Sequence, residues 1–216
     1  LLNGANLLAI GDGSAAGWEL FQFQAAVPVA PDVYDLSVRL RGQAGTDADM
    51  LPSWPAGSLV VLMDGTPGQT ALPMSARGLA RHYRIGPATR ASSDPSYVHL
   101  VEAFAGIGLR PYSVCQLQAR PLASGDLAIS WVRRTRIDGD SWVGIDVPLG
   151  ETREQYLLRI MTGGTVRREI VVPSPAWTYT LTDRAADGLA GQPFDIHVAQ
   201  LSDAFGAGPF TRISQP

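Results

Sequence analysis

Lysine is missing altogether from this chain of 216 residues, and all 17 of its basic residues are arginine. Asparagine occurs only at positions 3 and 6, whereas alanine, glycine, proline and arginine are abundant. These biases are typical of a GC-rich genome, so the arginine content does not by itself indicate phosphate binding. The formal net charge is −3, and a chain without a positive excess is a poor candidate for sequence-independent binding of nucleic acid.

Cysteine and long apolar runs are also scarce. Cys115 is the single cysteine, so the chain cannot form an internal disulfide, and a zinc site would need three other ligands. The longest uninterrupted apolar run, residues 59–63, is far too short to span a bilayer, and no signal peptide is visible. We therefore expect no transmembrane segment, and no motif in the chain indicates a cofactor.

Turn-forming residues are plentiful: 23 glycines and 16 prolines leave little room for long helices. A hydrophobic content of 45% excludes a wholly disordered chain, and the length suits one or two domains. The dominant sequence period is two. In residues 33–41, every second residue from Tyr34 to Leu40 is apolar and those between them are polar. The sequence therefore predicts an all-β protein with two β-domains.

The first half predicts an antiparallel β-domain over residues 1–110. The continuous apolar run at 58–63 predicts a central strand, and the run at 7–10 predicts a strand with an unpaired edge that would invite aggregation. Because the chain opens at Leu1 without a methionine, we expect a fragment of a longer polypeptide. Strands from upstream or from a neighbouring subunit would complete the domain. Further strands are predicted at 20–25, 33–41, 79–85 and 97–104.

The second half, residues 111–216, predicts an immunoglobulin-like sandwich of seven short strands about 8–12 residues apart. The string TGGT (162–165) predicts a tight hairpin, because glycine accepts the positive φ that such a turn requires. Trp131 would fill the space between the sheets. The best helix candidate, 182–189, is short. Strands are predicted at 113–120, 126–135, 154–161, 166–172, 176–181, 193–201 and 210–213.

This second half resembles a fibronectin type III domain through Trp131, the run YTLT (179–182) and the run FDIHVA (194–199). Such domains commonly carry a tyrosine near the start of the sixth strand. This chain has Phe194 there, so no corner hydrogen bond from a hydroxyl is expected at that position. The resemblance says little about function, because these sandwiches serve as spacers, adaptors and binding modules alike.

The most specific string in the chain is LRGQAGTD (40–47), in which Gly42 and Gly45 bracket a polar turn and Thr46 and Asp47 can hydrogen-bond the local backbone. Together with WELFQF (18–23), it resembles the large tail-tip proteins of long-tailed phages and gene transfer agents. The likeness is to the C-terminal region of baseplate proteins of the megatron, or host-specificity, type. Further strings that fit this family are RHYRIGP (81–87), GLRPY (108–112), ISWVRRTR (129–136) and GDSW (139–142).

This resemblance implies a structural virion component and no enzyme. The implied location is the tail baseplate of a phage-like particle, assembled in the bacterial cytoplasm and then released. There the chain would act as scaffold or adaptor for fibres or for contact with the host envelope during DNA delivery. Implied partners are the hub, the distal tail protein, the tail fibre, further copies in a homotrimer and a cell-surface glycan. Two stiff β-domains joined near Pro111 would transmit position to such a fibre.

Residues that could carry catalysis or bind metal form no constellation in the sequence. GDSW (139–142) resembles the opening block of a GDS-type esterase, with Ser141 as the nucleophile. Asp195 and His197, however, would share one outward face of a strand and would not orient a base toward that serine. We therefore favour a plain loop there. The histidines are scattered without helical pairing, which argues against a metal site.

Candidate contact residues are aromatic or basic. Trp142, in a predicted loop, is the best single candidate, and its alternative is a plug over the sandwich core. Trp54 also lies in a predicted loop. Arg133, Arg134 and Arg136, together with Arg167 and Arg168, form a basic cluster that is either a solvated sheet face or a dock for an acidic protein surface or an anionic glycan.

Three functions are compatible with these patterns. The first is the tail-tip scaffold, which we expect because it needs no catalytic residues. The second is a carbohydrate-binding accessory region of a secreted glycan-active protein, in which loop aromatics stack on sugars. The third is an esterase that uses Ser141. A parent gene among tail genes favours the first, and a signal peptide with a hydrolase domain favours the second.

Overall fold

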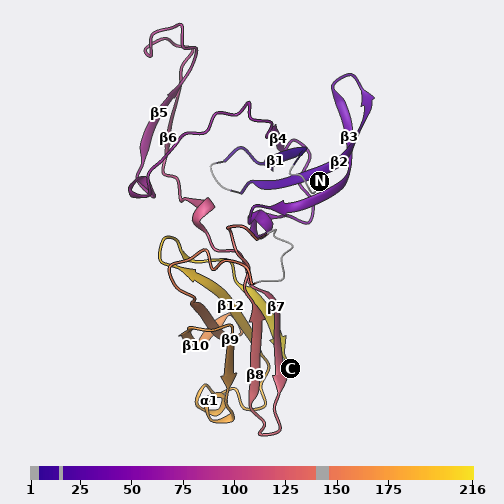
Figure 1. Cartoon of the computed structure of the whole chain (residues 1–216), viewed down its shortest axis with the longest axis vertical. Coiled ribbons are helices and arrows are strands. Elements are labelled where there is room, and N and C mark those ends of the chain that lie inside the picture. Colours follow the sequence, from indigo (N-terminus) through magenta and orange to yellow (C-terminus); the bar gives the residue numbers. More distant parts are fainter. Residues whose placement is uncertain (1–4, 15–16, 140–145) are drawn as a thin grey trace. The chain divides into compact units, whose positions relative to one another are not determined.

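The computed structural model describes residues 5–14, 17–139 and 146–216. The chain divides into two compact units, Leu1–Gly108 (unit 1) and Leu109–Pro216 (unit 2), close to the boundary expected between 110 and 111. Within the described ranges its regular secondary structure is almost wholly antiparallel strands, with one short α-helix and three 3-10 turns (Figure 1). The all-β prediction is confirmed.

Unit 1 contains a four-stranded antiparallel sheet in the order β3-β2-β1-β4 and a separate hairpin, β5–β6. Two expectations about this sheet are wrong. The run at 7–10 is no unpaired edge, because β1 pairs with β2 on one side and β4 on the other. The run at 58–63 forms an edge strand, β4, and not a central one. The elements are β1 (Leu7–Gly11), β2 (Glu19–Ala30), β3 (Val33–Gln43), η1 (Thr46–Asp49), β4 (Leu59–Leu62), η2 (Met74–Ala76), β5 (Arg81–Ile85), β6 (Val98–Glu102) and η3 (Ile107–Leu109).

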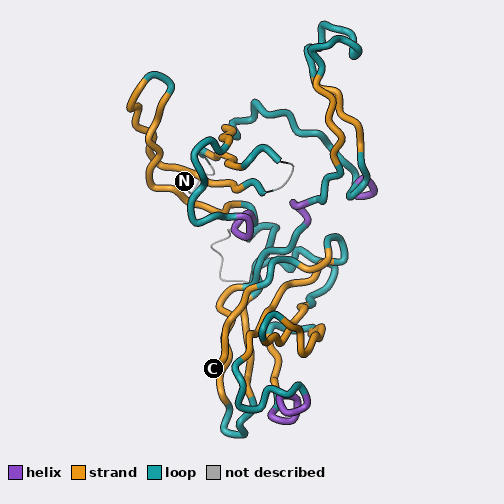
Figure 2. The backbone as a smooth tube through the Cα atoms, turned by 180° about the vertical axis from the view of Figure 1, so that it is seen from behind, coloured by secondary structure: helices purple, strands orange, loops and turns teal. Residues whose placement is uncertain are grey.

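Most of the β2–β3 hairpin extends beyond the sheet as a two-stranded arm (Figures 1 and 2). Strand β1 pairs with β2 only as far as Gln22, so the rest of β2 pairs with β3 alone. We call residues 24–38 the arm. Most of its side chains are exposed, Val29 and Tyr34 among them. Two strands without a covering layer gain little stability in water.

Unit 1 buries few apolar side chains. In its described part the buried ones are Leu8, Ala9, Phe21 and Ala76, whereas all four residues of β4 are exposed. A continuous run of valine and leucine normally marks a strand that is covered on both faces, which is why the sequence predicted a central position for it. The apolar side chains of β4 are therefore not covered by the described part of this chain.

Unit 2 is a sandwich in which the three-stranded sheet β11-β8-β7 faces a second sheet in which β12 lies between β9 and β14, with β10 beyond β9. Its first, second and fifth strands thus share one sheet, which is a fibronectin type III-like arrangement. Trp131 fills the space between the layers as predicted, and its ring meets Tyr156 edge-on with centroids 5.1 Å apart. The elements are β7 (Cys115–Pro121), β8 (Leu127–Val132), β9 (Tyr156–Thr162), β10 (Thr165–Val172), β11 (Ala176–Tyr179), α1 (Leu181–Ala186), β12 (Phe194–Ser202), β13 (Gly206–Ala207) and β14 (Thr211–Gln215).

Local turn chemistry in unit 2 follows the sequence closely. Gly163 and Gly164 connect β9 to β10 with φ of 54° and 79°, the positive values that the TGGT string predicts. Helix α1 covers the first part of the expected 182–189 segment. It begins after Thr180, whose hydroxyl accepts the backbone N–H of Asp183, and it ends before Gly188, where φ is 72°.

The corner of the sandwich near Phe194 uses a hydroxyl from another strand. Phe194 occupies the usual tyrosine position, and its ring packs edge-on against Tyr179 at 5.6 Å. The Tyr179 hydroxyl donates to Asp187 at 2.6 Å, and Arg168 donates to the same carboxylate at 2.7 Å. A phenol and an ion pair therefore tie β10, β11 and the end of α1 together.

Candidate functional site

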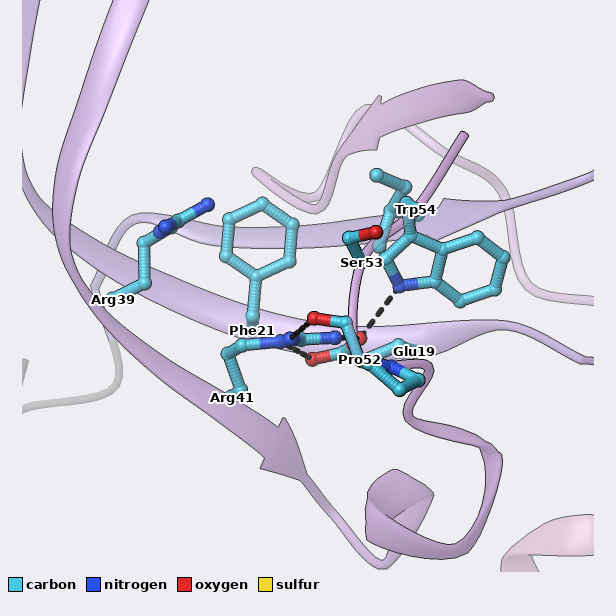
Figure 3. A pocket seen from close by; sticks show the side chains of 8 residues that line it. Glu19, Phe21, Arg39, Arg41, Pro52, Ser53 and Trp54 are labelled. Carbon is cyan, nitrogen blue, oxygen red and sulfur yellow. Dashed lines mark hydrogen bonds and ion pairs between the residues drawn. The ribbon is translucent and has the colours of Figure 1, made fainter. Parts of the chain in front are cut away.

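A buried carboxylate is the centre of the most elaborate polar site in unit 1. The side chain of Glu19, at the start of β2, is completely buried. Arg41, near the end of β3, donates to it through Nε at 2.7 Å and through Nη2 at 2.6 Å (Figure 3). A two-pronged contact of this kind fixes both side chains in one geometry.

The carboxylate also holds the loop that follows β3. Trp54 donates its indole Nε1–H to Glu19 at 2.6 Å, and the backbone N–H of Gly42 donates to it at 3.3 Å. Arg41 reaches on to the carbonyl of Leu51 at 2.6 Å. We call Glu19, Arg41 and Trp54 the Glu19 clamp. It fastens residues 50–54 onto the sheet by charged hydrogen bonds.

The LRGQAGT string supplies the turn that the clamp requires. Gly42 has φ of 62°, and a Cβ there would lie 2.9 Å from the backbone of Asp47, so a side chain would not fit. Gly45 has φ of 80° and precedes η1. Thr46 accepts the N–H of Leu20 at 2.9 Å and donates to the carbonyl of Gln43 at 2.8 Å. The predicted turn role of Gly42, Gly45 and Thr46 is thus confirmed.

Within the clamp, the negative charge of Glu19 is balanced by the positive charge of Arg41. Burial alone would raise the pKa of Glu19, but the hydrogen bonds from Arg41 and Trp54 and the charge of the guanidinium outweigh it, so the pKa is lowered. The hydrogen bond to Glu19 raises the pKa of Arg41. Glu19 therefore stays ionised and accepts four donors. This arrangement suits positioning of a loop and does not suit proton transfer.

A cavity of about 300 Å³ lies beside the clamp, and we call it the Arg39 pocket. Its apolar wall includes Phe21, and in the view of Figure 3 this ring lies between Arg39 and Trp54. Arg39 makes no hydrogen bond or ion pair with any residue that the structure describes, whereas Arg41 donates four hydrogen bonds to Glu19 and the loop carbonyls. The lining residues are Ile10, Glu19, Phe21, Arg39, Arg41, Pro52, Ser53 and Trp54.

Of the contact residues predicted from sequence, Trp54 belongs to this site and Trp142 lies outside the described residues. The clustered arginines at 133, 134 and 136 are held by local partners. Arg133 pairs with Asp146 at 2.7 Å, and Arg136 pairs with Glu151 at 2.9 Å. Arg134 lies over the ring of Tyr112, 5.0 Å from its centroid.

These arginine contacts fasten the segment 146–151 to the end of β8. The side chains of Arg133 and Arg136 are only 13% and 17% exposed, so little of either is available to a partner. Ser141, the candidate nucleophile, also lies outside the described residues. His197 lies on the face of β12 opposite the buried Ile196 and Val198, and its ring is tilted against that of Phe210 with centroids 6.2 Å apart.

Sequence reasoning missed two juxtapositions. Glu19 and Arg41 are 22 residues apart, and only the pairing of β2 with β3 brings them together. His82 and His99 meet on the β5–β6 hairpin, where two ring nitrogens lie 2.9 Å apart. Among the described residues no group of three or more histidine, cysteine or acidic side chains could hold a metal ion. No helix in the described ranges combines the length and apolar character that crossing a bilayer requires.

Comparison with solved structures returns matches at low similarity. The rat CD45 extracellular domains d3–d4 align with 9% identity and a TM-score of 0.37, covering 88% of this chain and 93% of that one. Chicken CNTN1 domains FN1–FN3 align with 11% identity and a TM-score of 0.34, covering 97% and 53%. Because these scores are low, the fold assignment rests on the strand order itself.

Comparison with curated protein sequences gives no match. A family model does match, and it falls on the part of the chain that contains the clamp. Residues 1–61 span β1, β2, β3 and Trp54. This first part of the chain is similar to the family described as "Rcc01698-like, C-terminal".

Proposed function

We propose that this chain is a structural segment of a phage-like tail baseplate, with no catalytic activity of its own. It acts as scaffold and adaptor at the tail tip, where fibres attach or the host envelope is contacted. The similarity of residues 1–61 to the Rcc01698-like family supports this, because that family is found in gene transfer agent-type proteins. Resemblance of the LRGQAGTD string to the tail-tip proteins points the same way.

One observation carries the proposal: unit 1 exposes apolar strands that a free-standing domain would bury. Strand β4 presents Leu59, Val60, Val61 and Leu62 at 37–54% exposure. Contiguous apolar surface of this kind marks protein–protein contact. A subunit of a large particle covers such surfaces with its neighbours, in copies of the same chain or in the adjoining hub, distal tail and fibre proteins.

Unit 2 suits the adaptor part of this role. Its core is closed, with Tyr156, Leu158, Ile160 and Ile196 fully buried. Ion pairs, and hydrogen bonds that arginine side chains donate to loop carbonyls, hold its loop 146–151 to the sandwich. A well-packed sandwich whose loops are held in place is rigid. Rigidity is a property that a spacer between other proteins requires.

The test is to locate the chain in an intact particle. A short epitope inserted between Gly163 and Gly164, at an exposed turn, leaves both cores untouched. Immunoelectron microscopy of particles that carry the tagged parent protein should place the label at the distal end of the tail. Untagged particles are the control. Label on the head, or tagged protein found only outside particles, would overturn the proposal.

A further inference from the structure

We propose that the Arg39 pocket receives an acidic side chain, aspartate or glutamate, from an apolar segment of a partner protein. This inference rests on the proposed function in one respect: the partner is expected to be another protein of the tail. Nothing in the tail-tip role requires this particular pocket to be occupied.

The residues that line the pocket carry one net positive charge, because two arginines face a single glutamate. Glu19 and Arg41 cancel each other in charge, and Arg41 directs its hydrogen bonds at Glu19 and at the loop carbonyls of Leu51 and Pro52. Arg39 adds a second guanidinium without an acidic partner in the described chain. Arg39 is an exposed residue beside an apolar wall. A carboxylate pairs with such an arginine most specifically, because the fork of N–H groups matches it in geometry.

The shape of the pocket limits the size of the occupant. A volume of about 300 Å³ is at the lower end for a small-molecule site and suits one or two side chains. Phe21, which is 7% exposed, and Ile10 form apolar walls. A carboxylate on a short methylene stem would place its stem against these walls and its oxygens at Arg39.

The surroundings favour a protein over an acidic sugar. Cross-strand pairing puts Ile10 on the same sheet face as Val60, and Leu8 on the same face as Leu62. Val60 and Leu62 are 54% and 48% exposed. Arg39 therefore lies near an exposed strip of aliphatic side chains. A peptide segment with apolar residues next to its acidic residue would cover that strip. A sugar ring, rich in hydroxyls, would leave its polar groups against hydrocarbon.

The absence of lysine in this chain makes the contact measurable. In Arg39→Lys the new amine is the only lysine amine within these 216 residues. A water-soluble carbodiimide activates a carboxylate, and an amine that already touches it displaces the urea by-product to form an amide. The variant is built into the parent protein, and assembled particles are treated and analysed by peptide mass spectrometry. Arg167→Lys, at an exposed arginine of β10, is the matched control.

We expect the Arg39→Lys variant to be joined through its new amine to an aspartate or glutamate of another polypeptide of the tail, with a yield at least tenfold above that of Arg167→Lys. Joining to an acid of this same polypeptide, or equal yields in the two variants, would overturn the pocket inference while leaving the tail location intact. Joining to a protein outside the particle would keep the pocket and contradict the tail-tip role.

The substitution Arg39→Gln provides a second readout, because it removes the cation and adds no reactive amine. In particles that carry Arg39→Gln, the amount of the partner identified by cross-linking that stays bound to the particle should fall at least tenfold. Unchanged retention, or loss of uronic-acid oligosaccharide binding instead, contradicts the proposal.

Discussion

At the scale of single residues, Glu19 holds the first sheet and the following loop together. Its carboxylate is buried, ionised and bonded to four donors from β3 and from Trp54. An ion pair in this setting is costly to break, because removing one charge leaves the other partly desolvated. Local order around residues 41–54 therefore depends on one side chain.

The substitution Glu19→Gln tests that dependence. It preserves shape but removes the charge and turns an acceptor into a donor facing Arg41, so we expect the free energy of unfolding to fall by about 2–4 kcal/mol. Urea denaturation of the whole chain, followed by tryptophan fluorescence, measures it. Arg39→Gln, which removes no described contact, should change stability by less than about 0.5 kcal/mol. Equal stability of the two variants would contradict this account of the clamp.

The lowered pKa of Glu19 adds a pH dependence with a definite sign. An unfolded glutamate titrates at 4.5, and the folded carboxyl titrates below that value. The unfolded chain thus binds more protons in this interval, so the contribution of Glu19 is complete above about pH 4.5 and is lost as the pH falls through the folded pKa. The difference in unfolding free energy between wild type and Glu19→Gln should therefore shrink between pH 6 and pH 3. A difference that stays constant would show that the carboxylate is not held ionised.

Sequence reasoning could find some of these residues and not others. Trp54 was identified because an aromatic in a loop needs a reason to be there, and the turn glycines by their spacing. Arg133 and Arg136 stood out as charges, but their partners Asp146 and Glu151 come 13 and 15 residues later and could not be assigned without the fold. Glu19 gave no local signal, because its burial arises from strand pairing.

At the scale of elements, the period-two pattern predicted the positions of the strands well, but it predicted less well which strands lie at the edge of a sheet. The strands β8 and β9 of unit 2 alternate buried residues with half-buried or exposed ones, and they were predicted nearly to their bounds. For β4 the continuous apolar run correctly predicted a strand and wrongly predicted a central place. In the proposed role, neighbouring chains cover β4, and such contacts cannot be inferred from the packing of this chain alone.

The arm is the element whose behaviour should change most on assembly. Beyond Gln22, strand β2 pairs only with β3, and most side chains from 24 to 38 are exposed. In the free chain we expect amide hydrogens of the arm to exchange at least about tenfold faster than those of residues 20–22. Hydrogen exchange with mass spectrometry measures this, with β12 in the sandwich core as the slow reference. Arm exchange as slow as that of β12 would mean that the ribbon is stable by itself.

At the scale of the whole molecule, the two units differ in how complete their cores are. Unit 2 closes two sheets over a common core around Trp131, and unit 1 leaves most of its large apolar side chains exposed. Expressed separately, residues 109–216 should give a monomer that unfolds cooperatively, because that core is self-contained. Residues 1–108 should be poorly soluble, because β4 offers an apolar edge strand. Sedimentation velocity distinguishes these outcomes, and a soluble monomeric 1–108 would count against an incomplete first unit.

The most direct test of the central claim, that unit 1 is covered by neighbours, uses the methionines. Met50, Met63 and Met74 are exposed in unit 1, at 41–58%, while Met161 is half-buried in the sandwich. Hydroxyl-radical oxidation with mass spectrometry reports side-chain access at each. We predict that the three unit 1 methionines oxidise at least fivefold more slowly in assembled particles than in the dilute free chain, with Met161 unchanged. Equal rates in particle and free chain would contradict the account.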